Sequence, residues 1–143
     1  MSQKQLGLAS ALLLVLVLWA PAAQAQESYK VIVNVANPVD GLSRSEAARL
    51  FLTKTPWDSG EAAFPVDLTA NSPVREEFSR DVLGMSPAAA VQAWKRQFGD
   101  PPPAVASDRE VLAFVRLKRG AIGYVSSSAN VQGVKVLTIV KPK

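Results

Sequence analysis

The stretch at residues 70–78, Ala-Asn-Ser-Pro-Val-Arg-Glu-Glu-Phe, has the residue types and spacing of a helix start that holds an anion. Ser72 is a typical N-cap residue, and Pro73 suits the first helical position because no N–H is needed there. Arg75 then falls in the first turn, where the helix dipole favours negative charge. A cation there is unfavourable unless an anion lies beside it, so the sequence predicts an oxyanion site.

Other helices of the chain are predicted to start differently. Capping boxes that begin at Ser43 and Ser107 place a glutamate, not a cation, at the third helical position. The contrast makes Arg75 unusual within its own chain. A second interpretation is open, in which Arg75 is solvated or pairs with a nearby acid, Glu76 or Asp67.

The residue types of the chain exclude several kinds of catalytic site. The chain contains no histidine and no cysteine, so neither a usual zinc site nor a Ser/His/Asp or Cys/His nucleophile can be built. The acids Asp67, Glu76, Glu77 and Asp81 lie close together in the sequence, but interspersed arginines are more typical of a solvated helix face. We therefore predict a protein that is not an enzyme and needs no metal or cofactor. A carboxylate enzyme is the least favoured alternative.

The basic residues are scattered along the chain, whose net charge is +4. A nucleic-acid interface would need a clustered basic face with aromatic side chains that stack on bases. No such cluster is present in the sequence, so we expect no nucleic-acid partner.

The first 25 residues have the pattern of a secretory signal peptide. Lys4 provides the positive start, Leu6 to Ala20 form an apolar run, and Ala23-Gln24-Ala25 is a small-x-small cleavage site. An uncleaved anchor is the alternative, but the apolar run is shorter than the roughly 20 residues that span a membrane. We expect a periplasmic or secreted protein whose single domain covers residues 26–143.

Strand and helix patterns alternate along that domain. Strands are predicted at 29–36, 64–68, 121–125 and 134–140, and helices at 43–53, 72–83, 86–98 and 108–118. Residues 99–106, with three consecutive prolines, are predicted to form an exposed connection. This alternation predicts an α/β lobe in three layers, with a largely parallel central sheet and helices on both faces.

Parallel sheets bind ligands beyond the carboxyl ends of their strands, where helix starts converge. Asn37 follows the first predicted strand, and Asn71, Ser72 and Arg75 follow the second. The sequence therefore predicts that these four side chains share one edge of the sheet.

Several segments together resemble the phosphate-binding substrate-binding proteins of ABC transporters, which have the type 2 periplasmic-binding-protein fold. The segments are residues 34–43, Asn-Val-Ala-Asn-Pro-Val-Asp-Gly-Leu-Ser; 48–54, Ala-Arg-Leu-Phe-Leu-Thr-Lys; Trp57; 72–78, Ser-Pro-Val-Arg-Glu-Glu-Phe; and 120–125, Gly-Ala-Ile-Gly-Tyr-Val. The resemblance implies that an oxyanion such as phosphate is held by the turn containing Ser72, Val74 and Arg75. Pro73 and Val74 replace the glycine and threonine of the family's turn, so one hydroxyl is missing.

Complete members of that family have two lobes, whereas this chain has the length of one. Two or three charge-assisted hydrogen bonds contribute on the order of 5 kcal/mol and the helix dipole up to about 2. Association costs at least about 4 kcal/mol, and micromolar binding needs about 8 net. A lone lobe should therefore bind phosphate weakly unless a second copy, a transporter or another envelope protein completes the site. The alternative function is a protein-interaction module that keeps the fold without the ligand.

Overall fold

The computed structural model describes residues 28–140, so the predicted signal peptide lies outside the described residues. The strands are β1 Tyr29–Asn34, β2 Gly41–Ser43, β3 Phe64–Pro65, β4 Asp67–Leu68, β5 Ala104–Val105, β6 Ala121–Ser126 and β7 Val134–Val140. The helices are α1 Arg44–Leu52, α2 Pro73–Phe78, α3 Pro87–Phe98 and α4 Asp108–Leu117, with a π-helical turn, η1 Ser79–Leu83, directly after α2. Within this range no helix has the length and apolar character needed to cross a membrane.

The main sheet has the strand order β2-β7-β1-β6-β3. β2 is parallel to β7 and β3 is parallel to β6, whereas β1 is antiparallel to both of its neighbours. Four strands therefore run in one direction and the middle strand runs against them. The predicted α/β class is confirmed, but the sheet is mixed at its centre. Burial on both faces gives a strand the same apolar pattern in either direction, so the pattern of β1 did not reveal this.

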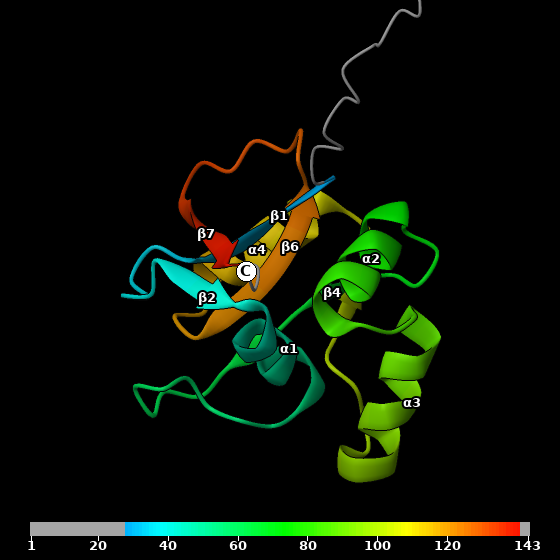
Figure 1. Ribbon diagram of the computed structural model, residues 1–143. Helices are drawn as coiled ribbons and strands as arrows, with labels where there is room; N and C mark the ends of the chain where they lie inside the picture. The colour runs from blue at the N-terminus through cyan, green and yellow to red at the C-terminus, as the bar shows by residue number, and fades with distance from the viewer. Residues whose placement is uncertain (1–27, 141–143) are drawn as a thin grey trace, which may run out of the picture.

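Helices cover both faces of the sheet, as predicted (Figure 1). On one face α1 and α2 pack through an aromatic cluster, in which the Phe78 ring stacks on Tyr124 with centroids 3.9 Å apart and lies 4.9 Å from Phe51. On the other face lies α4, and the Asn34 side-chain amide donates a 2.9 Å hydrogen bond to the Val115 carbonyl of that helix. The aromatic cluster and the amide bond fix the three layers.

Gly123 in β6 allows α4 to approach the sheet closely. A Cβ atom at this position would lie 2.7 Å from a methyl carbon of Val111 and 2.8 Å from one of Val66. Glycine inside a strand often marks such a close approach.

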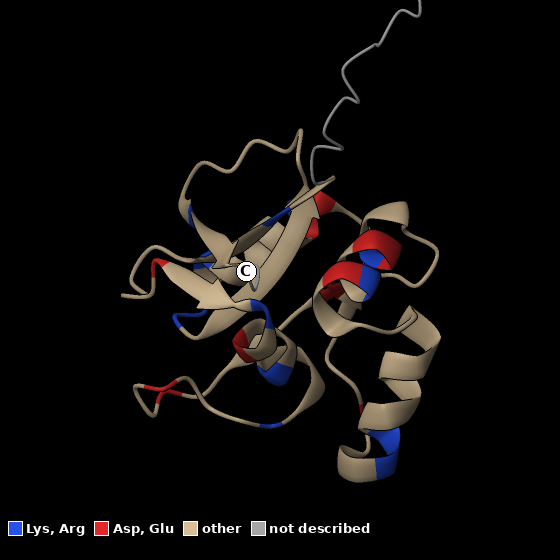
Figure 2. Cartoon of the chain, viewed as in Figure 1, with Lys and Arg blue, Asp and Glu red and all other residues tan. Residues whose placement is uncertain are grey.

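Charged residues of both signs are spread over helices and loops on the face shown in Figure 2. The strands at the centre of that view carry few charges, and the side chains of β1 and β6 among them are mostly buried. The sheet edges, where loops and helix ends meet, are therefore where charged side chains lie close to the sheet.

Candidate functional site

The predicted helix start at Ser72 lies at the carboxyl edge of β6. The preceding segment runs alongside β6, with hydrogen bonds from Phe64 N to Gly120 O (3.0 Å) and from Val66 N to Ile122 O (2.9 Å). Beyond β4 a turn leads into α2, and the Ser72 hydroxyl accepts a 3.3 Å hydrogen bond from the backbone N–H three residues on. The N-cap and its place at this edge are as the sequence predicts.

Arg75 does not face the open helix end. Its side chain folds inward, where Nη1 donates a 2.8 Å hydrogen bond to the Leu68 carbonyl and Nη2 lies 3.7 Å from an Asp67 carboxylate oxygen. Only 6% of Arg75 is exposed. Arg75 thus pairs with Asp67, which agrees with the second interpretation of this cation and not with direct contact to an anion.

Asp67 needs this cation because the carboxyl group is itself buried. The Tyr124 hydroxyl donates a 2.9 Å hydrogen bond to Asp67 and accepts one of 3.2 Å from the Leu68 N–H. Burial raises the pKa of Asp67, while the Arg75 charge and the Tyr124 hydrogen bond lower it less strongly. At 3.7 Å the guanidinium is beyond hydrogen-bond distance, which explains why it compensates only in part.

Tyr124 shares this environment. Burial first, and then the negative charge of Asp67, raise the pKa of the Tyr124 hydroxyl, so it stays protonated and keeps donating to the carboxylate. Asp67, Arg75 and Tyr124 thus form a polar network inside the core. Its geometry explains how a charged pair is accommodated at the end of β4, and it presents no open nucleophile or base.

Three hydrogen-bond donors at the helix start are available to a ligand. Asn71 is exposed, and although its side-chain oxygen accepts a 2.8 Å hydrogen bond from Thr69, no described group accepts from its amide nitrogen. No described group accepts from the Val74 backbone N–H either, and the Ser72 hydroxyl is half-buried. Together they offer the neutral donors that an oxyanion requires.

Asn37 does not belong to this group, so the prediction that it shares the edge is wrong. In the antiparallel pair of β1 and β6, Tyr29 pairs with Ser126 and Val33 with Ile122. Asn37 follows the carboxyl end of β1 and therefore lies beyond the amino end of β6. It is buried, its side-chain oxygen accepts from Val39 N at 3.0 Å, and its carbonyl accepts from Lys135. These bonds give Asn37 a local structural role.

Two arginines that sequence reasoning missed lie at the carboxyl edge of β2 and β7. Arg44 and Arg80 line a hollow of about 540 Å³, together with Ser43 and Ser45. Neither guanidinium forms an ion pair within the described part of the chain, and the Arg44 Nε is buried without a partner. Arg44 is the first residue of α1, so the cue that singled out Arg75, a cation in a first helical turn, also applied here.

Residues 28–140 contain no group of three or more acidic side chains placed to hold a metal ion. The donors of the carboxyl edge are instead hydroxyl, amide, backbone N–H and guanidinium groups, which suit anions.

Comparison with solved structures finds phosphate-binding proteins of transport systems. The ABC-type phosphate transport receptor from Vibrio cholerae superposes with a TM-score of 0.57 at 20% identity, over 78% of this chain and 47% of that one. PstS from Borrelia burgdorferi gives a TM-score of 0.63 at 14% identity, over 78% and 47% of the two chains. A putative phosphate ABC transporter substrate-binding protein with bound phosphate from Clostridium perfringens gives 0.62 at 19%, over 80% and 46%.

The chain therefore has the fold found in phosphate ABC transport substrate-binding proteins, as the sequence resemblance implied. It spans about half the length of the solved structures it matches. No protein-family model and no curated protein matches the sequence.

Proposed function

We propose that the protein binds an oxyanion such as phosphate at the start of α2, as a non-catalytic solute-binding component exported to the cell envelope. The observation that carries the proposal is the position of this helix start. It lies at the carboxyl edge of β6, in a fold shared with phosphate transport receptors, and its Asn71 amide and Val74 N–H have no described acceptor. Such edges are where α/β sheets bind ligands.

The groups proposed to bind the anion are the Asn71 side-chain amide, the Ser72 hydroxyl and the Val74 backbone N–H. Arg75 does not contact the anion directly in this proposal. Its guanidinium lies in the core under the helix start, where it stabilises the turn through the Leu68 carbonyl and Asp67. Arg44 and Arg80, which line the hollow at the carboxyl edge of β2 and β7 together with Asp81, add positive charge at this edge of the sheet.

Binding by this half-site alone should be weak. Two or three charge-assisted hydrogen bonds and the helix dipole together exceed the cost of association by only about 3 kcal/mol, which corresponds to a Kd in the millimolar range. Tight binding needs a second surface. A transporter subunit, another envelope protein or a second copy of the chain would supply it, and the half-length match to the phosphate receptors supports this requirement.

The test is isothermal titration calorimetry of the purified protein with phosphate and with sulfate at low salt. Ser72→Ala should weaken binding about tenfold, since one charge-assisted hydrogen bond is lost. The control is Asn37→Ala, which changes the opposite edge and should leave the affinity unchanged. Equal affinity in the Ser72→Ala protein, or no heat up to tens of millimolar anion, would overturn the proposal.

A second candidate function is a protein-interaction module of the envelope. It is favoured by one observation: Arg75, the cation that suggested an anion site, is engaged by Asp67 and the Leu68 carbonyl. Sedimentation velocity over a wide range of protein concentrations, with and without phosphate, tests it. Self-association that is independent of phosphate, together with no anion heat, would favour the module over the solute-binding protein.

A further inference from the structure

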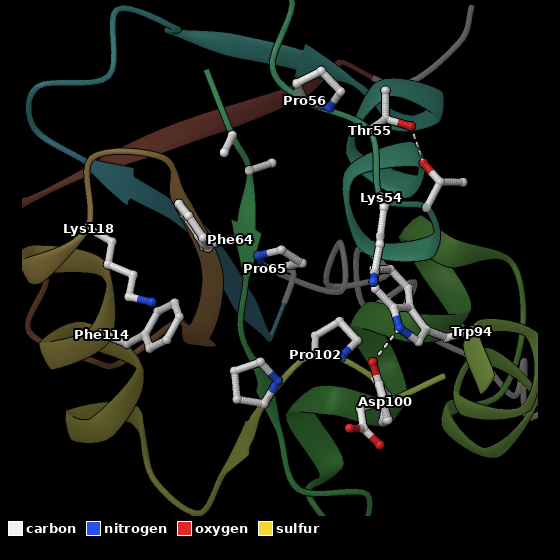
Figure 3. Close-up of a pocket in the computed structure, with 15 residues that line it drawn as sticks. Lys54, Thr55, Pro56, Phe64, Pro65, Trp94, Asp100, Pro102, Phe114 and Lys118 are labelled. Atoms are coloured by element: carbon white, nitrogen blue, oxygen red, sulfur yellow. Dashed lines mark hydrogen bonds between the residues drawn. The ribbon is translucent and has the colours of Figure 1, made fainter. Parts of the chain in front are cut away.

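A second concave region lies at the opposite edge of the sheet. It is a cleft of about 430 Å³ at the amino ends of β3 and β6, shown in Figure 3. Its apolar lining comes from segments far apart in the sequence: Phe64 and Pro65 of β3, Trp94 of α3, Pro102 of the proline segment and Phe114 of α4. The start of α2 is at the other edge, so this cleft is separate from the proposed oxyanion site.

The walls of the cleft are held by hydrogen bonds and do not depend on a ligand. The Trp94 indole donates a 2.6 Å hydrogen bond to the Asp100 carbonyl, which fixes one wall. The Asp67 N–H donates a 2.9 Å hydrogen bond to the Pro103 carbonyl, which ties the proline segment to the neighbouring strand. Pro65 has no N–H, so the edge of β3 cannot continue the sheet into the cleft. Phe64 is 41% exposed.

Two lysines stand on opposite walls of the cleft (Figure 3). Lys118 lies with its ammonium nitrogen 4.6 Å from the ring centroid of Phe64 and 5.0 Å from that of Phe114. Lys54 lies on the Trp94 side, where Asp100, the acidic residue of the lining, is also found. Neither lysine forms an ion pair with any residue that the structure describes.

The positive charge on the Lys118 wall is therefore not balanced by an acid of the cleft. The negative end of α4 favours a cation at this position, but an ammonium group has three donors and can serve the helix end and a ligand together. Its contacts with two ring faces place the charge beside apolar surface. An anionic group attached to an apolar body is the chemistry that complements this wall.

We propose that this cleft binds a small apolar acid. Its acidic group pairs with Lys118, and its aromatic or acyl body lies over Phe64, Pro65 and Pro102 toward Trp94. The volume falls in the range of about 300 to 1,000 Å³ typical of small-molecule sites, which are mostly apolar with a few placed polar groups.

The experiment uses two fluorescent probes that differ in charge. Anilinonaphthalene sulfonate is an apolar acid, and N-phenyl-1-naphthylamine is a neutral molecule with a closely similar body. The purified protein is titrated with each. Lys118→Gln should weaken binding of the sulfonate about threefold to fivefold and leave binding of the neutral amine unchanged. Lys95→Gln is the matched control, because this exposed lysine of α3 does not line the cleft.

A second variant tests whether the apolar part of the probe contacts Phe64. Phe64→Ser should weaken the binding of both probes, and urea unfolding checks that the variant keeps the wild-type transition.

Phosphate at 10 mM, matched for ionic strength with chloride, should not displace the sulfonate, which separates this site from the proposed oxyanion site. Equal sulfonate affinity in wild type and Lys118→Gln would overturn the proposal. Loss of probe binding as protein concentration rises would also overturn it, since a second copy would then occupy the cleft.

Discussion

The two edges of the sheet use charge in opposite ways. At the carboxyl edge Arg75 is turned into the core, where it compensates the buried carboxylate of Asp67. At the amino edge Lys118 lies against aromatic rings in an open cleft and has no acidic partner among the described residues. A cation in an unusual sequence position is therefore weaker support for a ligand site than a cation beside a cavity that has no acidic partner among the described residues.

The largest expected effect tests whether the Arg75 charge is structural. Arg75→Met should lower the free energy of unfolding by about 3 kcal/mol, because it leaves the Asp67 carboxyl buried without its cation. Lys118→Gln should change it by less than about 0.5 kcal/mol. Urea unfolding measures both. Adding Asp67→Asn to Arg75→Met should recover part of the loss, and a loss in Arg75→Met no larger than that of Lys118→Gln would remove the contrast between the edges.

A smaller effect is expected at a buried polar contact next to the amino end of β6. The Trp57 indole donates a 2.9 Å hydrogen bond to the Gly120 carbonyl, and both residues are buried. Trp57→Phe should lower the free energy of unfolding by about 1.5 kcal/mol, since it removes this hydrogen bond and leaves a small void, while the Gly120 carbonyl keeps its bond from the Phe64 N–H. Chemical denaturation again gives the value. A neutral result would mean that water replaces the indole at this edge.

A pair of N-cap variants separates folding from binding at the carboxyl edge. Ser72 and Ser86 each accept a hydrogen bond from the N–H three residues on, at 3.3 and 3.1 Å. Replacing either by alanine should cost about 1 kcal/mol of stability. Only Ser72→Ala should also weaken phosphate binding in the calorimeter. Equal loss of phosphate affinity in Ser86→Ala would show that the calorimeter reports stability and not a ligand contact.

The smallest expected effect is a pH dependence of the unfolding free energy. Burial raises the pKa of Asp67 above its ordinary value of 3.8, so the folded state binds its proton more tightly than the unfolded state. The associated stability is fully present below about pH 3.8 and is lost as the pH rises through the folded-state pKa. Asp67→Asn should therefore gain stability relative to wild type as the pH rises. A relative gain for the wild type instead would mean that the Arg75 charge outweighs burial.

Local features of the fold could be predicted from the sequence because each depends on a few neighbouring residues. Ser43 and Ser72 cap helices, and Gly123 admits α4 to the sheet, as their positions indicated. The direction of β1 could not be predicted, because a strand covered on both faces is apolar in either direction. The misplacement of Asn37 followed directly from that error.

The candidate sites were predictable only in part. The sequence indicated that Asp67 was within reach of Arg75, but it did not determine whether the side chain turned inward or outward. The apolar cleft had no local signal at all. Phe64, Trp94 and Phe114 belong to separate segments, and only the packing of α3, α4 and the proline segment brings them to one place.

The position of β1 in the middle of the sheet also constrains the order of folding. The first strand of the described chain pairs only with β6 and β7, the last two, so that Val31 lies opposite Tyr124 and Leu137. Contacts of such long sequence separation form slowly, because a large loop must close before they contribute. The sheet thus cannot be completed until β7 is available, and a chain still lacking that strand should stay open to chaperones and proteases.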